Sequence, residues 1–80
     1  MTHVVLYGKA GCHLCDEARE VVAAVRRQHP FELEEVDVST DPELHRTYGE
    51  RIPVLAVDGD DLFEFHVDAD ELARRLQSGG

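Results

Sequence analysis

Two cysteines separated by two residues, Cys12 and Cys15, stand between an apolar run and an amphipathic stretch, and the chain has no other cysteine. The apolar run, residues 3–7, is β-branched and aromatic and stops at Gly8, which is typical of a strand buried on both faces. The residues after it predict a helix that ends at His29-Pro30, because apolar side chains recur at helical spacing: Leu14, Ala18, Val21, Val22 and Val25. The cysteines therefore fall at the start of a helix, about one turn apart on one face.

The rest of the chain predicts one small α/β domain with the order βαβαββα. Residues 31–38, 54–57 and 62–66 are expected strands, and a turn at 58–60 joins the last two as a hairpin. Asp41-Pro42 is a helix start, with the helix ending near Tyr48, and Asp68 with Glu71 resembles a capping box that opens a final helix. A right-handed parallel crossover followed by the hairpin gives a four-stranded mixed sheet with helices on both faces. We expect one domain over residues 1–77 and a flexible tail over 78–80.

Composition narrows the function classes. Eighty residues leave no room for a second core, and the formal net charge of −9 disfavours nucleic acid and anionic membranes as partners. The longest apolar run, residues 21–25, is far shorter than the ~20 residues of a membrane span, and no secretory signal is visible. One close cysteine pair without a signal predicts a cytoplasmic protein, and we expect a monomer.

The position of the two sulfurs predicts a division of labour in thiol–disulfide exchange. A Cys12 sulfur near the helix N-cap can accept hydrogen bonds from the backbone N–H groups of Leu14 and Cys15, which favours its thiolate. Cys12 is therefore the expected nucleophile. Cys15, nearer the apolar stripe, is the expected resolving thiol, which attacks the mixed disulfide formed between Cys12 and a substrate.

The sequence leaves open the roles of two residues near the cysteines and the possibility of a zinc site. His13 could stabilise the Cys12 thiolate or simply face solvent. Lys9 could also stabilise the thiolate, could bind a substrate carboxylate, or could be an ordinary surface lysine. A C-x-x-C pair is also half of a zinc site, although the five histidines show no spacing that would complete one. No metal and no bound organic cofactor are expected. Ile52-Pro53 precedes a strand, and by frequency alone its peptide bond would be trans.

Two segments carry a family resemblance. Residues 7–15 resemble the active-site segment of glutaredoxins, and residues 51–54 resemble their T-V-P segment. Since the element order also matches, the likeness covers nearly the whole chain and implies the minimal thioredoxin/glutaredoxin fold. More narrowly, the chain resembles small glutaredoxin-like proteins that carry C-H-L-C.

The resemblance implies a cis Ile52-Pro53 bond beside the cysteines and places Lys9, His13, Ile52, Pro53 and Asp68 at the substrate-binding site. Glutaredoxins carry two glycines before an aspartate after the fourth strand. Here Phe65 and His66 precede Asp68, and these bulky residues replace the glycines that allow close backbone approach. Glutathione could serve as a co-substrate, or a thioredoxin-type reductase could supply the electrons.

The leading hypothesis is a cytoplasmic thiol–disulfide oxidoreductase that reduces protein or glutathione mixed disulfides. Two other classes remain. One is a carrier of a metal ion or an iron–sulfur cluster that uses the C-x-x-C pair, and the other is a redox-inactive thioredoxin-like binding module.

Overall fold

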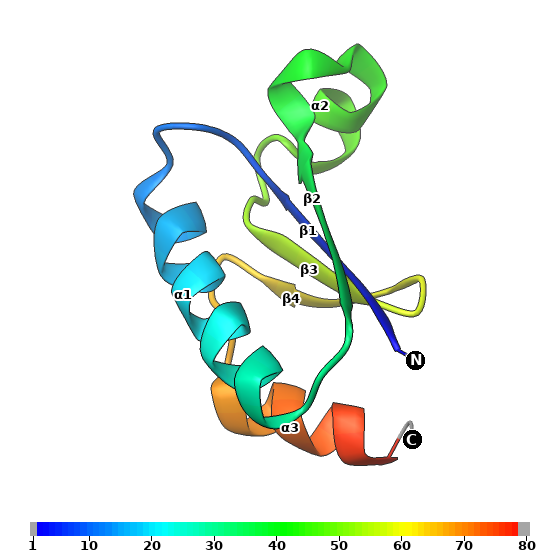
Figure 1. The fold of residues 1–80 in the computed structure, drawn as a ribbon. Coiled ribbons are helices and arrows are strands. Elements are labelled where there is room, and N and C mark those ends of the chain that lie inside the picture. The colour runs from blue at the N-terminus through cyan, green and yellow to red at the C-terminus, as the bar shows by residue number, and fades with distance from the viewer. Residues whose placement is uncertain (1, 79–80) are drawn as a thin grey trace.

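The computed structural model describes residues 2–78 and confirms the predicted order of the elements (Figure 1). The strands are β1 (His3–Gly8), β2 (Glu32–Asp37), β3 (Val54–Val57) and β4 (Asp60–Glu64). The helices are α1 (His13–Gln28), α2 (Pro42–Tyr48) and α3 (Ala69–Ser78), with a 3-10 turn (Val38–Thr40) ahead of α2.

The four strands form one mixed sheet in the order β2-β1-β3-β4. β1 runs parallel to β2 and antiparallel to β3, and β4 closes the sheet as the antiparallel partner of β3. β1 is therefore an inner strand, as its continuous apolar run predicts. Its C-terminal end leads into the short loop before α1 (Figure 1), which ends at Cys12, and Cys15 follows in the first turn of the helix.

The helices cover both faces of the sheet. Successive β1 side chains point to opposite faces, so β1 contacts helices on both. Val4 and Leu6 lie in the main core with residues from α1 and α3, whereas Tyr7 stacks on Tyr48 of α2. The buried members of the main core are Val4, Leu6, Ala18, Val22, Val25, Phe31, Leu55, Val57, Leu72 and Leu76. Each large side chain buried there stabilises the fold by about 1.5–3 kcal/mol before entropy is counted.

Some predicted boundaries are wrong, and β2 is one residue shorter at each end than predicted. The fourth strand is Asp60–Glu64 rather than residues 62–66. It ends at Glu64 because the backbone leaves the extended conformation at Phe65, whose φ is +66°. α3 continues to Ser78, where the sequence predicts the start of a flexible tail, and the rest of that tail lies outside the described residues. The last apolar contact of α3, made by the buried Leu76, holds this final turn against the core.

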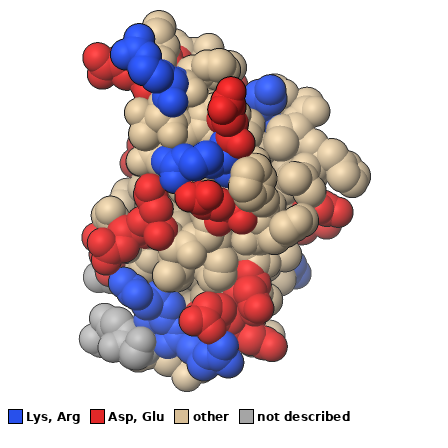
Figure 2. Space-filling model, turned by 180° about the vertical axis from the view of Figure 1, so that it is seen from behind, with Lys and Arg blue, Asp and Glu red and all other residues tan. Residues whose placement is uncertain are grey.

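Acidic and basic side chains are mixed on the surface of the protein (Figure 2). Figure 2 shows acidic and basic groups interspersed over the face opposite the view of Figure 1, so the net negative charge does not make this face uniformly acidic. Within residues 2–78, none of the helices combines the length and the apolar character that crossing a bilayer requires.

Candidate active site

Cys12 is the N-cap residue of α1. Its backbone is extended (φ −92°, ψ 116°), and its sulfur accepts a hydrogen bond from the backbone N–H of Cys15 at 3.3 Å. Gly11 before it has φ +78°, a left-handed conformation that glycine adopts without steric cost. The sequence predicts the backbone N–H groups of Leu14 and Cys15 as donors to this sulfur, and the structure shows the hydrogen bond from Cys15. A negative charge on the Cys12 sulfur would therefore face a backbone amide and the positive end of a 16-residue helix.

Cys15 differs from Cys12 in exposure. Cys12 is partly exposed, whereas Cys15 is fully buried against the end of β1. Its sulfur lies so close to Gly8 that a Cβ atom at position 8 would approach it to 3.0 Å. The absence of a side chain at Gly8 thus makes the space in which the Cys15 sulfur sits.

Burial raises the pKa of the Cys15 thiol to about 11. Desolvation of the charged form is the largest cause, and the hydrogen bond with Cys12 adds to it. A backbone hydrogen bond with Lys9 acts in the opposite direction. In the reduced protein at neutral pH, Cys15 is therefore a protonated thiol next to Cys12.

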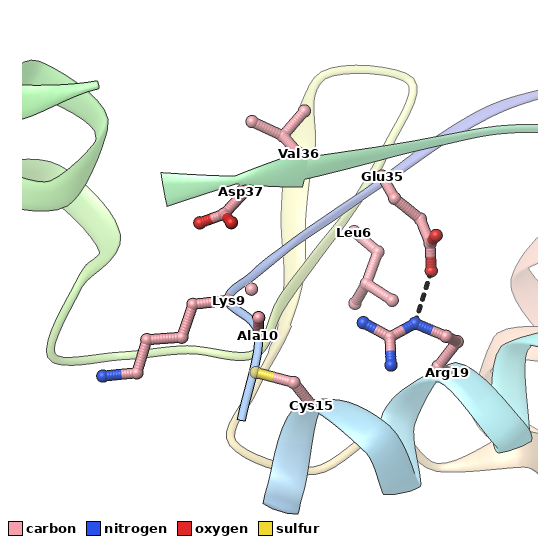
Figure 3. A pocket seen from close by; sticks show the side chains of 9 residues that line it. Leu6, Lys9, Ala10, Cys15, Arg19, Glu35, Val36 and Asp37 are labelled. Atoms are coloured by element: carbon pink, nitrogen blue, oxygen red, sulfur yellow. Dashed lines mark hydrogen bonds and ion pairs between the residues drawn. The ribbon is translucent and has the colours of Figure 1, made fainter. Parts of the chain in front are cut away.

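A cavity of about 240 Å³ lies beside Cys15, between α1 and β2 (Figure 3). Arg19 reaches across it from α1, and its Nε donates to Glu35 of β2 at 2.7 Å. Asp37 and Lys9 also line the cavity, but the Lys9 ammonium extends away from the Cys15 sulfur (Figure 3). The structure thus places Lys9 at the cavity beside Cys15.

A second cluster connects the cysteines to the loop before β3. Cys15 is buried with Val38 and Ile52, and partly buried apolar side chains pack around them: Tyr7, Cys12, Leu44 and Tyr48. The Ile52-Pro53 peptide bond is cis, as the family resemblance implies and the frequency argument does not. The structure therefore brings together Cys12, Cys15 and Ile52, three of the residues predicted for the site.

An aromatic stack fixes the loop that carries Ile52. The Tyr7 and Tyr48 rings lie parallel with centroids 4.2 Å apart, and the Arg51 guanidinium lies over Tyr48 at 5.2 Å. Arg51 also donates to the Thr47 carbonyl and pairs with Glu64 at 2.7 Å. These contacts hold the loop against the end of β1.

The two other predicted site residues have different surroundings. His13 is exposed at the first position of α1, with its Nε2 atom 3.6 Å from a Glu17 carboxylate oxygen. Asp68 caps α3, where its carboxylate accepts from the backbone N–H groups of Asp70 and Glu71 at 2.9 and 3.1 Å. Residues 2–78 contain no group of three or more histidine, cysteine or acidic side chains arranged to hold a metal ion.

Sequence reasoning missed Gly8, Tyr7 and Tyr48 as parts of this site. A glycine that ends a buried strand just before a C-x-x-C is a usable signal, because it marks close approach. The Tyr7–Tyr48 contact has no such signal, since the two residues lie far apart in the sequence and meet only through the sheet.

The contact between Gly8 and Cys15 can be tested by overpacking. We expect Gly8→Ala to destabilise the protein by about 1–3 kcal/mol, because neither the strand nor the helix can easily move away from the new methyl group. The cost should be smaller in a Cys15→Ser background, where the smaller oxygen relieves the contact. Urea unfolding of the four proteins in this cycle measures the coupling, and an equal cost in both backgrounds would show that the sulfur is not the atom displaced.

Comparison with known proteins places this chain in a family. The family model described as "Glutaredoxin-like domain (DUF836)" matches residues 3–77. An uncharacterised protein of Mycobacterium tuberculosis, Rv0508, is 30% identical over 74 residues, which are 86% of this chain and 76% of that protein.

Solved structures agree with the family match. The X-ray structure of protein XcR50 from X. campestris superposes with a TM-score of 0.77 at 32% identity, over 94% of this chain and 96% of that one. A chloroplastic thioredoxin z matches with a TM-score of 0.75 over 98% of this chain and 77% of its own, and its identity of 14% shows the fold alone. The chain therefore has the thioredoxin fold and belongs to the glutaredoxin-like domain family.

Proposed function

We propose that this protein is a cytoplasmic thiol–disulfide oxidoreductase that reduces disulfides of protein substrates through the Cys12/Cys15 pair. The observation that carries the proposal is the contrast between the two sulfurs. Cys12 is accessible at a helix N-terminus, and Cys15 is buried directly behind it. This is the arrangement that two-step exchange requires, with one sulfur to meet the substrate and one to release it.

In the first step the Cys12 thiolate attacks one sulfur of the substrate disulfide. The substrate S–S bond breaks, its other sulfur leaves as a thiolate, and a mixed disulfide joins Cys12 to the substrate. The backbone N–H of Cys15 stabilises the attacking sulfur, and partial exposure gives the substrate access. The cis Ile52-Pro53 segment beside the cysteines is our candidate for the backbone that positions the substrate chain.

In the second step Cys15 loses its proton and attacks the Cys12 sulfur. The mixed disulfide breaks, the substrate leaves as a thiol, and a Cys12–Cys15 disulfide forms. Two electrons have then passed from the protein to the substrate. Glutathione or a thioredoxin-type reductase would return them, and a reduction potential between about −270 and −200 mV would suit either donor.

The direct test is catalysed reduction of a protein disulfide, with insulin as substrate and dithiothreitol as reductant. The wild-type protein should accelerate reduction above the rate with dithiothreitol alone. Cys12→Ser should not, because the accessible sulfur is gone. If the wild-type protein failed to accelerate reduction of insulin and of several other disulfide proteins, the proposed function would be wrong.

The raised pKa of Cys15 predicts the pH dependence of the second step. Below about 11 the reactive thiolate is the minor form, so its fraction, and with it the rate, should rise about tenfold per pH unit between about pH 7 and pH 9. Desolvation is the largest cause of the shift. It depends on the burial of Cys15 and not on the state of Cys12, so we expect the pKa to stay raised in the mixed disulfide. Rapid-quench release of a peptide from a preformed Cys12 mixed disulfide measures this rate, and a flat profile would contradict rate-limiting deprotonation of Cys15.

A further inference from the structure

Phe65 has a backbone conformation that a bulky residue rarely adopts. Its φ is +66°, and the N–H of His66 donates to the carbonyl of Glu64 at 2.7 Å across it, which makes a tight turn of three residues. Glycine would adopt this conformation freely, whereas a phenylalanine there is strained. Strain of this kind tends to be retained where the side chain has a function.

The turn is attached to the candidate active site. The backbone N–H of Phe65 donates to the carbonyl of Pro53 at 2.8 Å, so the turn is fixed to the cis-proline loop beside the cysteines. Phe65 is also the only large apolar side chain in residues 2–78 that is exposed, with 43% of its surface accessible. The structure thus presents an exposed aromatic side chain on a turn that is bonded to the cis-proline loop.

The Phe65 ring lines a groove of about 330 Å³ between α1 and the segment that follows β4. Leu14, which lies between the two cysteines, forms one wall together with Val21 further along α1. Phe65 and Val67 line the opposite side. The groove therefore extends from the C-x-x-C segment along the helix, and we call it the Phe65 groove.

The charges of the Phe65 groove favour a basic occupant. Glu17 and Glu20 line it, and its described lining contains no lysine or arginine. Glutathione is a small peptide with two carboxylates and one ammonium group, so these carboxylates oppose its binding.

We propose that the Phe65 groove binds the polypeptide beside the reactive cysteine of a protein disulfide, with an apolar side chain against Phe65 and a basic one beside Glu17 and Glu20. This inference rests on the proposed oxidoreductase function and specifies its substrate class. Contact with an aromatic ring supplies affinity, and the two carboxylates select against acidic sequences.

The test compares three mixed disulfides that share one chromophoric aryl thiol as leaving group. The first carries a short peptide whose cysteine is flanked by leucine and lysine, the second a peptide flanked by serine and glutamate, and the third glutathione. In a Cys15→Ser background, the Cys12 thiolate attacks the peptide sulfur, the aryl thiolate leaves, and the peptide stays on Cys12. Release of the aryl thiolate therefore measures the first step alone.

We expect the leucine/lysine probe to react about tenfold faster than the other two, which is the size of effect that one well-packed side chain gives. Phe65→Ala should bring its rate down to that of the other probes. Phe65→Gly removes the ring and also suits the left-handed turn, so a rate loss in both variants cannot come from misfolding. Added salt should reduce the part of the leucine/lysine probe's rate advantage that is electrostatic. The double variant Glu17→Gln with Glu20→Gln should remove that same part.

The matched control is Glu32→Gln with Glu34→Gln, which removes two carboxylates from β2 away from the groove and should leave the ratios unchanged. Equal rates for the three probes in the otherwise unaltered protein, or an unchanged ratio in both Phe65 variants, would overturn the inference while the proposed function stands. Absence of reaction with every probe would instead count against the proposed function.

Discussion

Cys15→Ser is expected to convert the protein from a turnover catalyst into a trap for its substrates. Cys12 remains accessible at the helix N-terminus, so the first attack still occurs. The buried sulfur that would release the substrate is missing, and the mixed disulfide should accumulate stoichiometrically. Multiple-turnover reduction should fall to the level of the reductant alone, which intact mass spectrometry and a turnover assay together would show.

Cys12→Ser is the matched control for the trap. It keeps one thiol per molecule, but that thiol is the buried Cys15, whose pKa is raised to about 11. We expect no mixed disulfide on the same time scale. If the two single variants trapped substrate equally, the assignment of Cys12 as nucleophile and Cys15 as resolving thiol would be refuted.

Leu55→Ala should cause a large loss of stability. Leu55 is fully buried at the centre of β3, where it lies opposite Leu6 of β1 and Phe63 of β4. Truncation removes buried surface and leaves a cavity, at a cost of about 2–5 kcal/mol. A domain of this size has roughly 4–12 kcal/mol of stability in total, so a large part of it would be lost.

Urea unfolding of the reduced protein gives the free energy of unfolding for this comparison. Leu62→Ala, on the edge strand β4, is the control because Leu62 is only partly buried against the same core. Its cost should be less than half that of Leu55→Ala. Equal costs would mean that the sheet centre is less tightly packed than the structure indicates.

Most of the fold could be predicted from the sequence because local patterns agree with the tertiary structure. The periodicity through Val22 and Val25 locates α1, Asp41-Pro42 marks the start of α2, and residues 54–57 are the observed β3. The prediction for the fourth strand is wrong at both ends. The alternation through Phe63 and Phe65 favours a strand that continues to His66, but the backbone leaves the extended conformation at Phe65.

The candidate site could be predicted in part. The C-x-x-C segment and the N-cap position of Cys12 follow from local sequence, and so does the capping role of Asp68. The space that Gly8 leaves for Cys15 and the Tyr7–Tyr48 stack depend on how β1 packs against α1 and α2. No local pattern encodes such contacts, because the residues involved meet only in the folded chain.

The central claim is that Cys12 and Cys15 form a reversible two-electron couple. A redox titration in glutathione buffers, quenched with an alkylating agent and read by intact mass, tests it directly. We predict a single transition between a dialkylated and an unalkylated protein, with a midpoint between about −270 and −200 mV. Two free thiols at every potential, or a disulfide that forms and cannot be reduced again, would contradict the account.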